Sequence, residues 1–192
     1  MFMYFCCQWA NYFFVAWMPV YLQEGRHFSE AQTSPVIFTL FITGIIGLMA
    51  GGFFGDWIVK RKGIRFGRRF VGATGLGMCG LMIFFSALTS HNYVSAYCLI
   101  AANGFFSFAV MASYAVCSDI GRNNTGTVTG AMNFFGQMGA FFLALMFGKI
   151  ADVTHNFNYP LFVVAFVMLT GCMLWFAIDP TKQLNIQTEN KN

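Results

Sequence analysis

Long stretches without a charged residue dominate this sequence. They cover residues 1–23, 31–55, 70–118, 123–148 and 153–178. Four of them are each long enough for one helix through a bilayer, which needs about 20 apolar residues. The stretch 70–118 is more than twice too long at ~1.5 Å per residue, so we expect it to break at the polar residues 89–92. The pattern predicts an all-α membrane protein with six transmembrane helices.

The expected spans are residues 1–22, 35–58, 70–88, 93–117, 127–150 and 160–178. They would form one transmembrane bundle over residues 1–179, followed by a polar tail at 180–192. Pro35 and Pro160 are expected to begin their helices, because the first turn does not use the missing N–H. A β-barrel is not expected, since membrane strands alternate apolar and polar residues and these stretches are continuously apolar.

Composition and charge support the same class and add an orientation. The chain is 57% hydrophobic and 9% charged, which excludes most soluble proteins. Nine basic residues fall on one side of the predicted bundle and only Arg26 and Lys149 on the other. The positive-inside rule then places both termini and the arginine-rich connection in the cytoplasm, for a multi-pass protein of the plasma (inner) membrane. A lipid bilayer is the expected partner, and no nucleic acid is expected.

Hydrolytic and metal chemistry are not expected. The three histidines, His27, His91 and His155, all fall in connections between spans, and no serine occupies a Gly-x-Ser-x-Gly turn. The six cysteines lie within or at the ends of apolar stretches without metal-ligand spacing. We therefore predict no enzyme activity, no metal and no cofactor.

Uncharged polar residues inside the spans are the candidate binding groups. An amide in hydrocarbon is costly unless it finds a partner, so it should face protein or a wet cavity. Asn133 and Gln137 are four residues apart and share one helix face. The predicted substrate-binding residues are Asn11, Tyr12, Ser107, Asn133 and Gln137. The alternative, that such groups only join helices by hydrogen bonds, is equally open at this point.

A glycine repeat leads into the arginine-rich connection. Gly47, Gly51 and Gly55 recur every fourth residue, and Gly126 and Gly130 do the same further on, a spacing that allows close helix packing. Asp56 stands near a helix C-terminus, where the helix dipole disfavours a carboxylate unless a cation is near. The candidates for that cation are Arg65, Arg68 and Arg69.

Three stretches resemble one family. Gly52 and Asp56, followed by the basic residues 60–69, resemble the cytoplasmic loop motif of the major facilitator superfamily. Residues 17–22, Trp-Met-Pro-Val-Tyr-Leu, resemble the seventh helix of its anion:cation symporter family, and residues 130–137 and 148–152 resemble the eleventh helix and its exit. The resemblance covers nearly the whole chain as the C-terminal six-helix half of such a transporter. Relatives often carry Asn where Gln137 stands, so the resemblance does not extend to the identity of the substrate.

The resemblance implies a secondary active transporter of small organic anions, such as sugar acids or carboxylates, coupled to protons. Substrate would bind near the bilayer midplane between two halves that expose it to each side in turn. Gly52, Asp56, Arg65, Arg68 and Arg69 would form a cytoplasmic gate motif. The resemblance implies that the N-terminal six-helix half of such a transporter is absent from this chain, and we expect the isolated chain to transport nothing. The alternative is a self-associating half-size carrier or channel made of two six-span copies.

Overall fold

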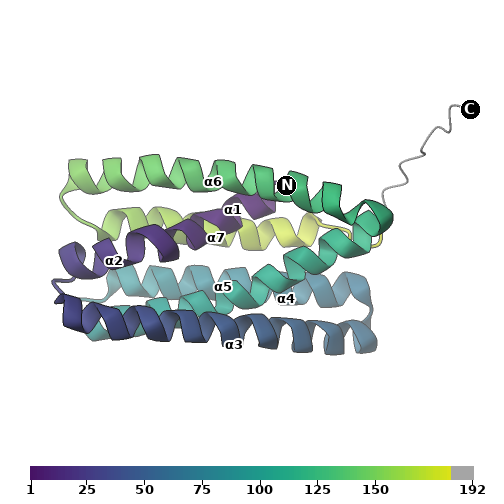
Figure 1. The fold of residues 1–192 in the computed structure, drawn as a ribbon, viewed down its shortest axis with the longest axis horizontal. Coiled ribbons are helices and arrows are strands. Elements are labelled where there is room, and N and C mark those ends of the chain that lie inside the picture. Colours follow the sequence, from purple (N-terminus) through teal and green to yellow (C-terminus); the bar gives the residue numbers. More distant parts are fainter. Residues whose placement is uncertain (183–192) are drawn as a thin grey trace, which may run out of the picture.

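The computed structural model describes residues 1–182, which are mostly helical. Its long helices are α3 (Glu30–Lys62), α4 (Ile64–Leu88), α5 (Asn92–Gly121), α6 (Thr125–Thr154) and α7 (Asn158–Ala177). An irregular helical segment precedes them, and all run roughly along one long axis (Figure 1). The α3–α4 connection, the α5–α6 turn and the end of α7 meet at one end of the bundle (Figure 1). We call it the arginine-rich end because it carries Arg65, Arg68 and Arg69, and we call the other the opposite end.

The N-terminal segment is helical but not regular. It consists of α1 (Phe2–Tyr12), a π turn at Phe13–Trp17, the short α2 (Met18–Val20) and a second π turn at Tyr21–Gly25. Proline lacks the amide hydrogen and its ring crowds the carbonyl four residues earlier. The helix just before Pro19 widens accordingly, and the Met18 N–H donates to the carbonyl oxygen of Phe13, five residues back. The helical segment expected over residues 1–22 thus exists, with two distortions and an extension to Gly25.

The long helices reach beyond the apolar stretches that predict them. α3 begins at Glu30, five residues before Pro35, and the side chain of Gln32 accepts a hydrogen bond from the Ser29 N–H at 3.1 Å. The prediction that Pro35 begins its helix is therefore wrong, because this N-terminal cap determines the start. Most of the expected arginine-rich connection is also helical. Only Gly63, with φ of 84°, separates α3 from α4, in a conformation that favours glycine.

Glycines allow α3 to approach α5 closely. A methyl group on Gly47 or Gly51 would overlap the backbone carbonyl oxygen of Gly104 or Phe108, respectively, on α5. The expectation of close packing is confirmed for these two positions of α3. It is wrong for Gly126 and Gly130, because no atom of residues 1–182 lies within 4 Å of the place where their methyl groups would be.

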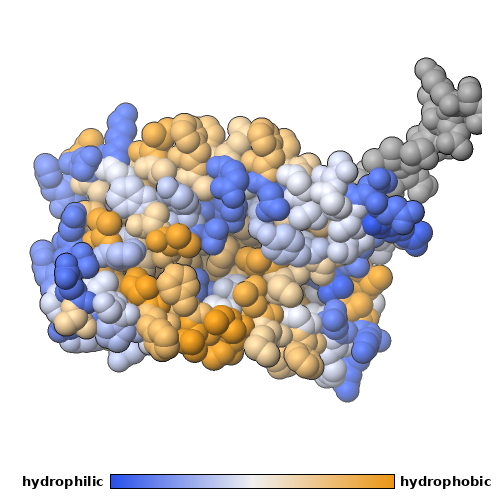
Figure 2. Space-filling model, in the orientation of Figure 1, coloured by the Kyte–Doolittle hydropathy of each residue, from blue (hydrophilic) through white to orange (hydrophobic). Residues whose placement is uncertain are grey.

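Four helical stretches are long and apolar enough to cross a membrane: Glu30–Lys62, Ile64–Leu88, Asn92–Thr154 and Asn158–Ala177. The third contains both α5 and α6, and the chain turns between them at Arg122, where φ is 45°. Hydrophilic side chains gather at the two ends of the bundle, and apolar side chains form a broad band between them (Figure 2). Phenylalanines in these helices are largely exposed, for example Phe38 at 68% and Phe166 at 71%. Such a surface fits hydrocarbon as its solvent.

Candidate functional site

A polar pocket opens between α1, α3, α5 and α6. It has a volume of about 360 Å³ and is lined by Tyr4, Gln8, Asn11, Leu48, Phe106, Ser107, Val110, Tyr114, Asn133 and Gln137. Hydrophilic surface interrupts the apolar band near the middle of the face seen in Figure 2. Four of the five predicted binding residues line one cavity: Asn11, Ser107, Asn133 and Gln137. They come from three helices that are distant in sequence.

The amides of this pocket are not used to hold the bundle together. Within residues 1–182, the side chains of Gln8, Asn11, Asn133 and Gln137 make no hydrogen bond, although the pocket exposes them to a ligand. Asn103 shows the contrast, because its side chain donates to the carbonyl oxygen of Leu40 at 2.8 Å and so joins α5 to α3. Asn103 is therefore a packing amide, whereas the pocket amides have unused donors and acceptors within residues 1–182.

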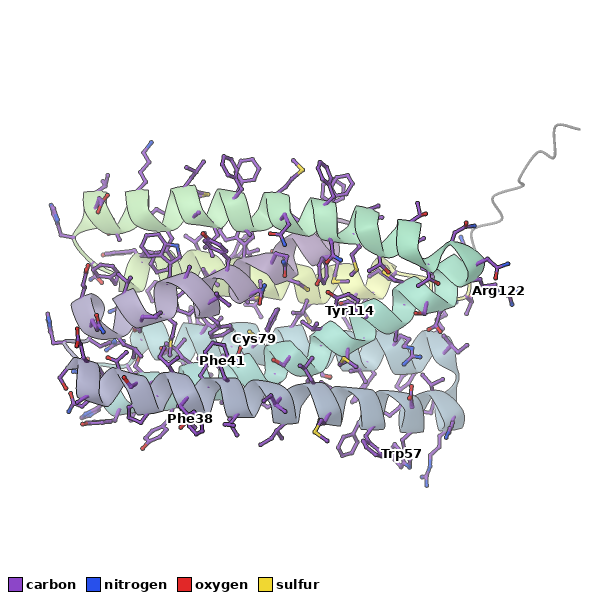
Figure 3. All side chains as sticks on the ribbon, in the orientation of Figure 1. Phe38, Phe41, Trp57, Cys79, Tyr114 and Arg122 are labelled. Atoms are coloured by element: carbon purple, nitrogen blue, oxygen red, sulfur yellow. The ribbon has the colours of Figure 1, made fainter. Side chains whose placement is uncertain are left out.

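Tyr12 does not line the pocket with the other predicted residues. Tyr4, Gln8 and Asn11 follow the helical spacing of one face, whereas the next residue is turned by about 100°. Tyr4 and Tyr114 are pocket residues that the sequence analysis missed; the Tyr4 hydroxyl donates to that of Tyr114 at 3.2 Å. Figure 3 shows Tyr114 on α5, where that helix passes α1 and α6. Extending the face of Asn11 backwards by helical spacing would have found Gln8 and Tyr4.

The chemistry of the pocket is uncharged and rich in hydrogen-bonding groups. Each amide offers two N–H donors and a carbonyl acceptor, and each hydroxyl is both donor and acceptor. None of the residues that line this pocket in the described part of the chain, 1–182, is charged. The wall therefore fits a small molecule with several hydroxyl or carboxylate oxygens, while any full positive charge that such an anion needs must come from elsewhere.

At the arginine-rich end, one arginine links three helices. The guanidinium group of Arg68 on α4 contacts Asp56 of α3 at 3.2 Å and Asp119 of α5 at 2.9 Å. Its side chain is only 14% exposed, and that of Asp119 is 21% exposed, whereas Asp56 is 67% exposed. Among the three candidate cations, Arg68 is the partner of Asp56. Asp119 is a second carboxylate of this cluster that the sequence analysis missed.

The other residues of the predicted gate motif lie apart from this cluster. Arg65 lies 3.7 Å from Asp179, and the Arg69 guanidinium donates to the carbonyl oxygen of Ile178 at 2.6 Å, so both contact the segment after α7. Hydrogen bonds from the side chain and backbone of Thr181 lower the pKa of Asp179, and the nearby arginines act in the same direction. Gly52 lines a shallow surface hollow beside Asp56.

At the opposite end, Arg26 is buried without a carboxylate. Its side chain is only 5% exposed, and it forms no ion pair within residues 1–182. The guanidinium group donates to the hydroxyl of Tyr21 at 2.7 Å and to the carbonyl oxygens of Ser86 and Thr89 at 2.7 and 2.8 Å. The charge pattern placed Arg26 in a connection between spans and gave no sign of this network.

Comparison with known proteins identifies the family. The sequence profile of the Major Facilitator Superfamily matches residues 1–144. The hexuronate transporter of Bacillus subtilis (strain 168) is 34% identical over 162 residues, which cover 82% of this chain and 38% of that protein. The probable galactarate/D-glucarate transporter GudP of Escherichia coli (strain K12) is 27% identical over 180 residues, covering 91% and 39%. The probable sulfoacetate transporter SauU of Cupriavidus necator is 27% identical over 181 residues, covering 92% and 41%.

The chain spans about two fifths of the length of these relatives. All three are named as transporters, and none as an enzyme. Together with the long apolar helices, the match identifies a multi-pass membrane protein. Since the family profile covers most of the chain and the hexuronate transporter exceeds 30% identity over most of it, this protein belongs to the Major Facilitator Superfamily.

Proposed function

We propose that this chain is the C-terminal six-span half of a proton-coupled, alternating-access transporter for small organic anions of the sugar-acid or carboxylate type. In this proposal the segment up to Gly25 and the five long helices each cross the membrane once. Both termini face the cytoplasm, because the arginine-rich end carries most of the basic residues. This places the chain in the anion:cation symporter family of the superfamily, in the inner membrane.

The unpaired amides of the pocket carry this proposal. Asn11, Asn133 and Gln137 lie together, uncharged and without hydrogen-bond partners in the described part of the chain. An amide at membrane depth is costly unless it contacts protein, water or a ligand, so a pocket with several amides favours a hydrophilic ligand or water. The names of the relatives indicate the chemical class of the ligand, since hexuronate, galactarate and glucarate carry both hydroxyl groups and carboxylates.

The rest of the machinery would come from a second six-span half. Among residues 1–182 no cation lines the pocket, so the opposite wall and the charge that attracts an anion belong to that partner in this proposal. The cluster of Asp56, Arg68 and Asp119 would hold three helices together at the cytoplasmic gate. The relatives do not favour assembly from two identical copies, because each is a single protein of which this chain matches about two fifths.

Alanine variants of the pocket test the proposal. In the assembled transporter, Asn133→Ala and Gln137→Ala are each expected to raise the KM for glucuronate uptake by about tenfold, the effect of losing one hydrogen bond of ~1.5 kcal/mol to a charged ligand. The KM is measured from the uptake of labelled glucuronate into proteoliposomes under an inward proton gradient. The matched control is Thr170→Ala on α7, whose exposed hydroxyl only donates to the carbonyl oxygen of Phe166. Equal KM values for all three variants would refute the assignment of the pocket.

A further inference from the structure

The arginine-rich end carries a second hollow, which shares no lining residue with the polar pocket. It has a volume of about 650 Å³ between α4 and α7, and is lined by Lys62, Arg65, Phe66, Arg69, Phe70, Ala73, Thr74 and Phe176. Cations thus surround its mouth, and aromatic and small apolar side chains form its walls. We propose that this hollow binds an anionic phospholipid, with the phosphodiester at Lys62, Arg65 and Arg69 and an acyl chain along α4.

The cations at the mouth retain donors for a phosphate. Lys62 contacts no carboxylate within residues 1–182, and its ammonium group lies 5.0 Å above the ring of Phe66. Arg69 uses one guanidinium nitrogen on the carbonyl oxygen of Ile178, and the side chain of Arg65 is 60% exposed. Phosphate oxygens accept such N–H donors readily, and basic sites between helices near a membrane surface are typical of anionic headgroup binding.

The apolar surface continues from the cationic mouth toward the middle of the bundle. Phe70 and Thr74 also line a neighbouring apolar hollow of about 460 Å³, which extends between α3, α4 and α5 to Met78 and Ala101. From Arg65 to Met78, α4 rises about 20 Å at ~1.5 Å per residue. That is more than half the thickness of the hydrocarbon core, about 15 Å. An acyl chain that starts beside Arg65 therefore has continuous apolar contact across its leaflet.

Chemistry favours a lipid over a soluble anion here. A free phosphate would occupy the cationic mouth and leave the phenylalanine walls unused. A zwitterionic lipid carries an ammonium group that offsets its own phosphate, so it would leave the positive charge of the mouth unbalanced. Only an amphiphile with a negative headgroup satisfies both surfaces. Asp179 competes for Arg65 at 3.7 Å, and its lowered pKa keeps it ionised at neutral pH. Removing that carboxylate should therefore strengthen lipid binding.

Native mass spectrometry of the detergent-purified chain tests this proposal. We expect phosphatidylglycerol to bind as a single equivalent, at least tenfold more tightly than phosphatidylethanolamine. The double variant Lys62→Gln/Arg65→Gln should lose about tenfold of this affinity, and Asp179→Asn should gain a few-fold. The matched control is Lys60→Gln/Arg61→Gln, which removes two cations that do not line the hollow; Arg61 instead lies over the ring of Trp57 at 4.2 Å. This control should bind like the unchanged chain.

Three results would overturn the proposal. The first is equal binding of the two lipids, and the second is an equal loss in both double variants, which would indicate general attraction to a basic surface. The third is displacement of phosphatidylglycerol by soluble glycerol phosphate at comparable concentration, which would assign the mouth to a free anion. Helical content measured by circular dichroism shows that each variant is folded, and the single variant Arg65→Gln replaces the double variant if the latter unfolds. None of these readouts depends on transport.

Discussion

Arg26→Met is expected to destabilise the bundle more than loss of any exposed cation. The guanidinium group of Arg26 donates to Tyr21, to the carbonyl oxygens of Ser86 and Thr89 and, at 3.3 Å, to the side chain of Asn158. Hydrogen bonds to a charged group contribute ~1.5–3 kcal/mol each, and methionine leaves the buried acceptors unsatisfied. We therefore expect a loss of at least about 3 kcal/mol, measured as a lower thermal unfolding midpoint in detergent.

A second substitution tests whether the planar shape of the Arg26 guanidinium group contributes to stability in addition to its charge. Arg26→Lys keeps the positive charge but lacks the planar group that reaches several acceptors at once, so it should recover only part of the lost stability. Lys149→Met is the matched control, because Lys149 is an exposed cation near the same end of the bundle. If Arg26→Met and Lys149→Met shifted the midpoint equally, the buried network would contribute nothing to stability.

Gly47→Ala is expected to force α3 away from α5. The added methyl group would overlap the backbone carbonyl oxygen of Gly104, which cannot move aside like a flexible side chain. Overpacking of a tight interface costs about 1–3 kcal/mol, and Gly51→Ala should add to it because its methyl would meet the carbonyl oxygen of Phe108. The measurement is the unfolding midpoint of the single and double variants.

Gly130→Ala is the control for this pair. Gly130 also lies within a long helix, but no atom in the described part of the chain lies within 4 Å of its added methyl group. Alanine favours a helix over glycine by roughly 1 kcal/mol, so this variant should be unchanged or slightly more stable. Opposite signs for the two substitutions are the expected result, and a similar loss at Gly47 and Gly130 would contradict the packing of α3 on α5.

Charge-free apolar stretches predicted the long helices because lipid imposes a strong constraint on sequence. A helix in hydrocarbon must be apolar over its whole crossing, so charge-free stretches located the centres of α3 to α7 well. The helix ends were less predictable, because they depend on local caps. Ser29 and Gln32 begin α3 upstream of Pro35, and Gly63 alone separates α3 from α4. Charged residues outside hydrocarbon can join a helix, and hydropathy does not report that.

The candidate site was predictable where residues share a helix face. Asn133 and Gln137 follow helical spacing and lie in one pocket, whereas Tyr12 is adjacent to Asn11 in sequence and lies on another face. Contacts between distant helices left no local signal. The pairing of Arg68 with Asp119 and the burial of Arg26 both depend on how the helices pack. The positions of the charged residues in the sequence therefore indicated only the end of the bundle at which each of them lies.

Protection of the pocket by a bound ligand is the sharpest test of substrate binding between α1, α5 and α6. In an assembled transporter whose native cysteines are replaced, Gln137→Cys places a single thiol in the pocket, and Tyr12→Cys places one outside its lining. The rate of labelling by a water-soluble maleimide is measured with and without glucuronate. We predict that glucuronate slows labelling at position 137 several-fold and leaves position 12 unchanged. Labelling at position 137 that proceeds at the same rate with saturating glucuronate, in a variant that still transports it, would contradict the account.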